Sequence, residues 1–183
     1  MKDNLLTRRQ IVAGVAAVLG SLAASSKIAA QTPPAKPEPP SAGADATRTS
    51  LHQEIDLRAS PQRIYEMLLD SKQFASFSGE PAEIGRAEGS AFSMFGGVIV
   101  GRTIELVPGQ RIVQAWRPTH WASGVYSLVH FELKAHGAQA TLILDHTGFP
   151  EGDFASLNYG WGLKYWKPLE KFLAADGHDK GAP

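Results

Sequence analysis

The chain has 183 residues, equal numbers of basic and acidic residues, and no cysteine. The lack of cysteine excludes disulfides, thiolate metal sites and cysteine nucleophiles. Residues 1–30 carry four basic residues and one acidic residue, which leaves 14 basic and 17 acidic residues in the rest of the chain. That remainder is slightly acidic, so we expect no nucleic-acid partner.

The first 30 residues have the pattern of an export signal. Arg8 and Arg9 precede an apolar run over residues 11–24. A helix of that length rises about 21 Å, short of a hydrocarbon core of roughly 30 Å, so we expect no membrane span to remain after the signal is removed. Residues 7–12 resemble the bacterial twin-arginine motif, with Ile and Val where Phe and Leu are usual. We predict cleavage after Ala30 and a periplasmic or secreted protein. The alternative to a twin-arginine signal is an ordinary secretory signal.

A proline-rich stretch separates this signal from the part of the chain that can build a core. Residues 31–50 contain five prolines among small and polar residues, a composition typical of an extended, solvated linker. All 16 aromatic residues stand at or after Tyr65, so a packed core is possible only beyond the linker. We predict one domain over residues 51–174 and a disordered tail over residues 175–183.

The domain begins with a strand and two short helices. Alternating apolar positions predict a strand from residue 51 to residue 58. Ser60 suits a helix N-cap and Pro61 suits the first helical position, so a helix should start there, followed by a second short helical segment over residues 70–77.

Short strands separated by turns follow, over residues 91–95, 98–107, 111–117, 125–133 and 140–147. Gly96 and Gly97 predict a tight hairpin turn, because both can adopt the positive φ that such a turn requires. Along residues 125–133, Val129, Phe131 and Leu133 share the apolar face of their strand.

One aromatic-rich helix closes the domain, over residues 155–173. Trp161, Tyr165, Leu169 and Phe172 are spaced by four, four and three, so they lie along one side of it. Pro168 removes the hydrogen bond to the carbonyl of Lys164, which predicts a bend or break there. The fold class is therefore α+β: a curved, six-stranded antiparallel sheet wrapped around a long C-terminal helix, with two short helices after the first strand.

Several runs together resemble a known family. They are Leu68-Leu69-Asp70, residues 92–97, 101–108 and 112–117, Thr147-Gly148-Phe149-Pro150, Gly160-Trp161 and residues 165–169. They are similar to bacterial homologues of the C-terminal domain of the activator of the 90 kDa heat-shock protein ATPase, in the START-like, or helix-grip, superfamily. The resemblance implies the six-stranded grip of the helix and a hydrophobic cavity. Activation of the cytosolic chaperone also needs a separate N-terminal domain in the eukaryotic members, so we do not expect it of an exported chain.

The predicted binding residues are those whose side chains should face such a cavity: Trp116, Phe131, His146, Trp161 and Tyr165. Aromatic side chains with a polar atom suit ligand pockets, although they also build plain cores. His146 could act as an acid or base, but a hydrogen-bonded structural histidine is the more common role. We predict no metal, because the histidines show no ligand spacing, and we identify no cofactor.

Three functions remain open at this stage. The leading hypothesis is a noncatalytic, exported domain that holds a small hydrophobic or amphipathic molecule between sheet and helix. The second is an enzyme, such as a cyclase, dehydratase or hydrolase, that uses His146 in the same cavity, an analogy with other START-like folds. The third is a module that binds another exported protein through an apolar patch. No sequence feature separates a monomer from a dimer.

Overall fold

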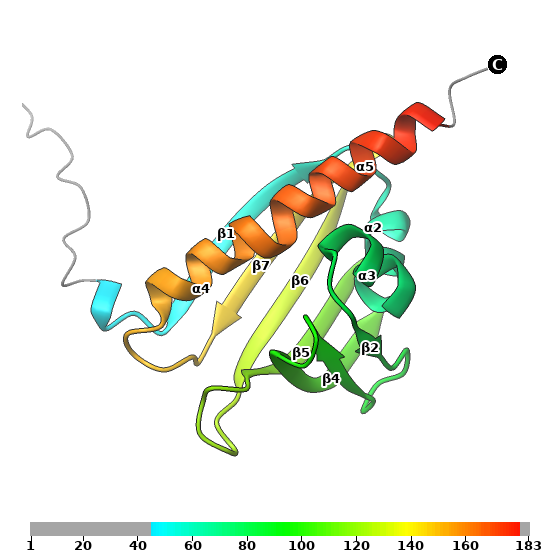
Figure 1. Ribbon diagram of the computed structural model, residues 1–183. Coiled ribbons are helices and arrows are strands. Elements are labelled where there is room, and N and C mark those ends of the chain that lie inside the picture. Colours follow the sequence, from blue (N-terminus) through cyan, green and yellow to red (C-terminus); the bar gives the residue numbers. More distant parts are fainter. Residues whose placement is uncertain (1–44, 180–183) are drawn as a thin grey trace, which may run out of the picture. The chain divides into compact units, whose positions relative to one another are not determined.

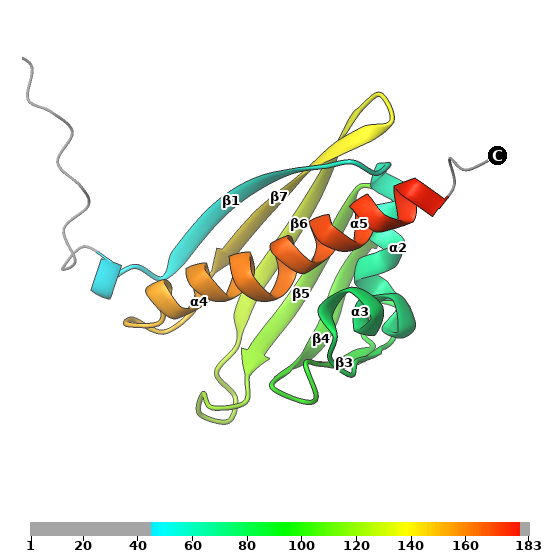
Figure 2. The ribbon, with the colours of Figure 1, turned by 45° about the horizontal axis from the view of Figure 1, so that its top comes forward.

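A seven-stranded antiparallel sheet curves around one long C-terminal helical segment (Figures 1 and 2). The computed structural model describes residues 45–179, so the predicted export signal and most of the predicted linker lie outside the described residues. The sheet order is β1-β7-β6-β5-β4-β3-β2. The strands are β1 (Ser50–Leu57), β2 (Glu83–Ile84), β3 (Ala91–Met94), β4 (Ile99–Val107), β5 (Arg111–Pro118), β6 (Ser127–His136) and β7 (Gln139–Thr147).

The sheet has one strand more than the six predicted. The additional strand, β2, has two residues and pairs with β3 through Glu83 and Ile84. Two residues are too few to show an alternating pattern, which is why the sequence gives no sign of it. Consecutive strands from β2 to β7 are neighbours, while β1 lies at the opposite edge of the sheet beside β7.

Two short helices, α2 (Pro61–Leu69) and α3 (Ser71–Ser78), follow β1, as predicted. They lead to β2 at the far edge of the sheet. The Ser60 side chain accepts a hydrogen bond from the backbone N–H of Arg63 and caps α2. Asp70 caps α3 in the same way, since its carboxylate accepts from the N–H groups of Lys72 and Gln73.

The turn between β3 and β4 is wider than the predicted two-residue turn. Met94 pairs with Ile99, so residues 95–98 form the connection. Gly96 and Gly97 have the expected positive φ angles of 63° and 93°, but Phe95 also has a positive φ, of 54°. The N–H of Gly96 donates to the carbonyl of Pro81 at 2.9 Å, which ties this turn to the segment after α3.

The last helical segment runs without interruption through α4 (Phe154–Gly160), the π-helical segment η1 (Trp161–Trp166) and α5 (Lys167–Asp179). The predicted bend or break near Lys164 is absent from this described segment. Instead, the hydrogen-bond spacing changes, because the N–H of Lys167 donates to the carbonyl of Gly162, five residues back. The wider turn accommodates Pro168, which has no N–H to donate. The helix also continues to Asp179, past its predicted end and into the predicted tail.

The π-helical turn changes which side chains face the sheet. Residues four and five positions after Trp161 are both buried, namely Tyr165 and Trp166. The indole N–H of Trp166 donates to the side chain of Gln53 on β1. The predicted helix face is confirmed: Trp161, Tyr165 and Leu169 are buried, and Phe172 is partly buried against the core. Trp166 joins this face because of the π-helical turn.

Candidate functional site

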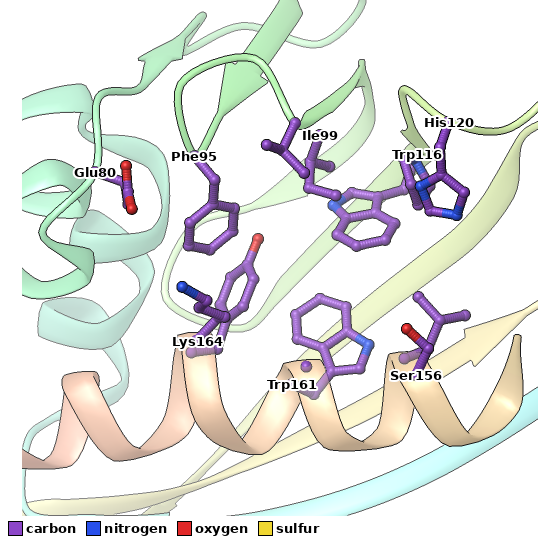
Figure 3. A pocket seen from close by; sticks show the side chains of 13 residues that line it. Glu80, Phe95, Ile99, Trp116, His120, Ser156, Trp161 and Lys164 are labelled. Carbon is purple, nitrogen blue, oxygen red and sulfur yellow. The ribbon is translucent and has the colours of Figure 1, made fainter.

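A cavity of about 350 Å³ lies between the C-terminal helix and the β3–β5 side of the sheet (Figure 3). The helix supplies one wall, with residues from α4 and η1. The turn after β3 and the end of β5 supply the other. The lining residues are Glu80, Phe95, Val98, Ile99, Trp116, Pro118, His120, Ser156, Leu157, Gly160, Trp161, Lys164 and Tyr165.

Aromatic rings in mutual contact form the middle of this lining. Trp116 from β5 stacks on Trp161 from η1, with ring centroids 5.3 Å apart and an interplanar angle of 22°. Trp161 also contacts Tyr165 at 4.4 Å. The ring of Phe95 meets Tyr165 edge-on at 5.1 Å. The cavity therefore offers flat apolar surfaces contributed by three separate elements.

Polar side chains stand at the two ends of the lining. In Figure 3, Glu80 and Lys164 lie at one end, and His120 and Ser156 at the other. All four are exposed to solvent. Apolar surface between polar rims suits an amphipathic molecule, whose polar groups can stay hydrated while its body is buried.

His146 on β7 is fully buried and does not line the cavity. Its Nδ1 accepts a hydrogen bond from the indole N–H of Trp161 at 3.1 Å, which places the ring proton on Nε2. Nε2 lies 2.7 Å from the Ser127 hydroxyl oxygen, to which it donates. The Ser127 hydroxyl in turn donates to the backbone carbonyl of Trp116 at 3.0 Å. We call these residues the His146 cluster: Ser127, His146, Trp161 and the carbonyl of Trp116.

The His146 cluster holds the histidine neutral. Burial lowers the pKa of His146 to about 3, because the imidazolium would lose its hydration. Both ring nitrogens are occupied by hydrogen bonds within the cluster. The arrangement fixes the Trp161 ring against β7, and His146, the acid or base named in the enzyme hypothesis, is not among the residues that line the cavity.

Three of the predicted binding residues line the cavity, namely Trp116, Trp161 and Tyr165. The other two, Phe131 and His146, lie behind it. Phe131 packs edge-on against Trp161 at 5.7 Å. Among the lining residues that were not predicted are Phe95, Gly160 and Lys164. Gly160 and Lys164 adjoin Trp161 along the helix, so their spacing could have identified them, whereas Phe95 depends on a turn of unexpected width.

Two buried donors at the cavity wall are poorly satisfied. The Tyr165 hydroxyl donates only to the Met94 sulfur, at 3.5 Å. The indole N–H of Trp116 has no hydrogen-bond partner among residues 45–179. Burial raises the pKa of Tyr165 far above its usual value, and the neighbouring Trp116 N–H acts in the opposite direction. Trp116 thus lies near the Tyr165 oxygen, outside hydrogen-bonding geometry, and Tyr165 remains a neutral phenol.

Within the described part of the chain, no group of three histidine or acidic side chains could hold a metal ion. The same residues include no helix that is long and apolar enough to cross a bilayer.

Comparison with known proteins identifies the family. Residues 58–174 match the family described as Activator of Hsp90 ATPase homolog 1-like protein. The chain belongs to this family. Its fold is also that of solved relatives. An HSP90 activator from Plasmodium falciparum matches with a TM-score of 0.66 and 24% identity over 69% of this chain and 97% of that chain. DynU16, from the dynemicin biosynthetic locus, matches with a TM-score of 0.59 and 19% identity over 69% of this chain and 48% of that chain.

The curated relatives are longer than the region they share with this chain. An activator of 90 kDa heat shock protein ATPase homolog from Dictyostelium discoideum is 30% identical over 116 residues, which cover 63% of this chain and 30% of the relative. Homolog 2 from Mus musculus is 24% identical over 135 residues, which cover 74% of this chain and 41% of the relative. The match thus spans less than half of either relative, and it establishes membership of the domain family.

Proposed function

We propose that this domain binds a small hydrophobic or amphipathic molecule, without catalysis, in the cavity between the sheet and the C-terminal helix. The observation that supports the proposal is the cavity of about 350 Å³ with Trp116, Trp161, Tyr165 and Phe95 in its lining. Ligand pockets in proteins span roughly 300–1,000 Å³ and are lined mainly by apolar and aromatic side chains. The size favours a compact ligand of one or two rings.

Two helical glycines provide a matched test. Gly160 lines the cavity, and Gly162 does not. A Cβ added at either position would meet no atom within 4 Å beyond its chain neighbours and the backbone of its own helical turns. Leucine should therefore be tolerated at both sites, and it favours a helix more than glycine does by roughly 0.8 kcal/mol. Only Gly160→Leu places a side chain in the ligand volume.

The experiment is native mass spectrometry of the full chain purified from a bacterium that expresses it, together with titration of the delipidated protein by 8-anilinonaphthalene-1-sulfonate. We expect a bound small molecule in the wild type and in Gly162→Leu, and its loss in Gly160→Leu. The dye should bind Gly160→Leu at least tenfold more weakly than it binds Gly162→Leu. Equal binding to both variants would contradict the proposal, as would a wild type that carries no guest and takes up no dye.

We further propose that the protein is exported, because Arg8 and Arg9 precede an apolar run of signal-peptide length. The test is fractionation of a bacterium that expresses the full chain. We expect mature protein outside the cytoplasm, and retention of precursor when Arg8 and Arg9 are both changed to Lys. Export that is unaffected by this double change would favour the general secretory route, and a wholly cytoplasmic wild type would refute export.

A further inference from the structure

The two poorly satisfied donors at the cavity wall carry an inference about what the ligand contains. Buried polar groups in native proteins nearly always have hydrogen-bond partners, so an exception calls for an explanation. The Trp116 N–H has no partner among the described residues, and Trp116 is only 4% exposed. The Tyr165 hydroxyl, on a side chain that is also 4% exposed, has only a thioether sulfur, which is a weak acceptor.

The surrounding side chains offer no better acceptor. Phe74, Phe95 and Trp161 surround Tyr165 with rings at 5.6, 5.1 and 4.4 Å between centroids. His146 meets the Trp116 ring edge-on at 5.2 Å, but both of its nitrogens already take part in the His146 cluster. The Tyr165 oxygen lies near the Trp116 N–H without the geometry of a hydrogen bond, so a well-placed acceptor for both donors would come from a bound molecule.

The Phe95 side chain packs beside one of these donors, against the Tyr165 ring. The Phe95 ring meets Tyr165 edge-on at 5.1 Å, and Figure 3 shows Phe95 and Trp116 on the same side of the cavity, opposite the helix. Phe95 has a φ of 54°, a left-handed conformation that is unusual for a bulky side chain. Backbone held in such a region often marks a ligand site, where the surrounding packing compensates for the strain. Movement of this turn would relieve the strain and open a path to the Tyr165 hydroxyl.

We propose that the inner end of the cavity recognises a carbonyl-type oxygen on a compact cyclic ligand, which accepts hydrogen bonds from Tyr165 and Trp116 after Phe95 swings aside. This inference rests on the cavity binding proposed above and adds the chemical class of the ligand. An indole N–H can only donate, and a buried phenol that resists ionisation keeps its proton. A ligand oxygen with free lone pairs suits both groups, because only an acceptor can pair with the Trp116 N–H.

The test compares two probes with the same bicyclic skeleton, 1-indanone and indane, which differ by one carbonyl oxygen. Binding to the full chain is measured by isothermal titration calorimetry at pH 7. A net hydrogen bond should make wild-type protein bind 1-indanone roughly three- to tenfold more tightly than indane. In Tyr165→Phe this preference should fall at least threefold. Trp116→Phe should also reduce it. The matched control is Tyr159→Phe, at a tyrosine that is 69% exposed, and it should keep the full preference.

Each other outcome identifies which proposal fails. Equal affinity of the wild type for the two probes would overturn the acceptor proposal and leave cavity binding in place. So would a preference that persists unchanged in both Tyr165→Phe and Trp116→Phe. A wild type that binds neither probe would count against binding in the cavity itself, and the acceptor proposal would fall with it.

Discussion

The Trp161 ring has two different surroundings. On the side of β7 it belongs to the His146 cluster, in which hydrogen bonds run from Trp161 through His146 and Ser127 to the Trp116 carbonyl. Toward the β3–β4 turn, the same ring meets Tyr165 and the cavity, where donors are poorly satisfied and Phe95 has a positive φ. A buried region whose polar groups are all hydrogen-bonded is held in one arrangement. A region with unsatisfied polar groups can instead hydrogen-bond to a bound ligand. The comparison indicates that the β7 side holds the wall in place and that the cavity side is adapted to a guest.

Removing the shared ring should have the largest effect on stability. Trp161 is 2% exposed and contacts both regions, so Trp161→Ala should lower the free energy of unfolding by about 3–5 kcal/mol, from lost packing and an unpaired His146. Urea denaturation measures the change. Tyr159→Ala, on the exposed side of α4, is the control and should change stability by less than about 0.5 kcal/mol. A small effect of Trp161→Ala would mean that the two regions are not joined through this ring.

Acidification should weaken the β7 side specifically. The pKa of His146 is lowered from 6.5 to about 3, so below pH 6.5 the unfolded chain binds a proton that the folded protein excludes. The contribution of His146 is therefore complete above pH 6.5 and is lost as the pH falls toward 3, at about 1.4 kcal/mol per pH unit. Between pH 7 and pH 5, the wild type should lose about 2 kcal/mol more than His146→Gln, measured by denaturation at both values.

Other titrating groups are common to both proteins in this comparison and cancel. One of them is His52, whose pKa is raised by its hydrogen bond to Asp145. Protonation of His52 on acidification therefore favours the folded state, whereas protonation of His146 disfavours it. If the wild type and His146→Gln lose the same stability, then His146 accepts a proton freely in the folded state and the neutral cluster is refuted.

Deleting one hydroxyl on each side compares the two regions directly. Ser127→Ala leaves the His146 N–H and the Trp116 carbonyl without their partner, which should cost about 1–3 kcal/mol. Tyr165→Phe removes a hydroxyl that donates only to sulfur and should cost less than about 0.5 kcal/mol. Thermal and urea unfolding measure both. A larger cost for Tyr165→Phe than for Ser127→Ala would show that the Tyr165 hydroxyl is already well satisfied in the free protein.

The β7 side could be predicted in part from the sequence. Leu142, Leu144 and His146 alternate along one strand, and the structure confirms that all three point inward. The partners of His146 could not be predicted in this way. Ser127 and Trp161 lie 19 and 15 residues away, and their contacts depend on strand pairing and on the rotation of the helix. Periodicity reports the face of an element but not which residues on two elements meet.

The cavity side was harder to predict, because two local irregularities shape it. The π-helical turn before Pro168 buries Trp166 together with Tyr165, and the sequence signal for it was the proline alone. The four-residue turn after β3 places Phe95 in the lining, although Gly96 and Gly97 favoured a tighter connection. In both places a tertiary contact outweighed the local rule, through Gln53 for Trp166 and through Pro81 for Gly96.

The smallest predicted effect concerns the strain at Phe95. Both Phe95→Gly and Phe95→Ala remove the ring, but only glycine is free of the roughly 1–2 kcal/mol penalty of a left-handed φ. Phe95→Gly should therefore be about 1 kcal/mol more stable than Phe95→Ala in urea denaturation. At Ser76, an exposed position within α3, the order should reverse, because glycine in a helix is less stable than alanine by roughly 0.5–1 kcal/mol. If alanine is at least as stable as glycine at position 95, the turn relaxes at little cost. Backbone strain would then contribute nothing to opening the cavity, and only the ring would keep a ligand oxygen from Tyr165.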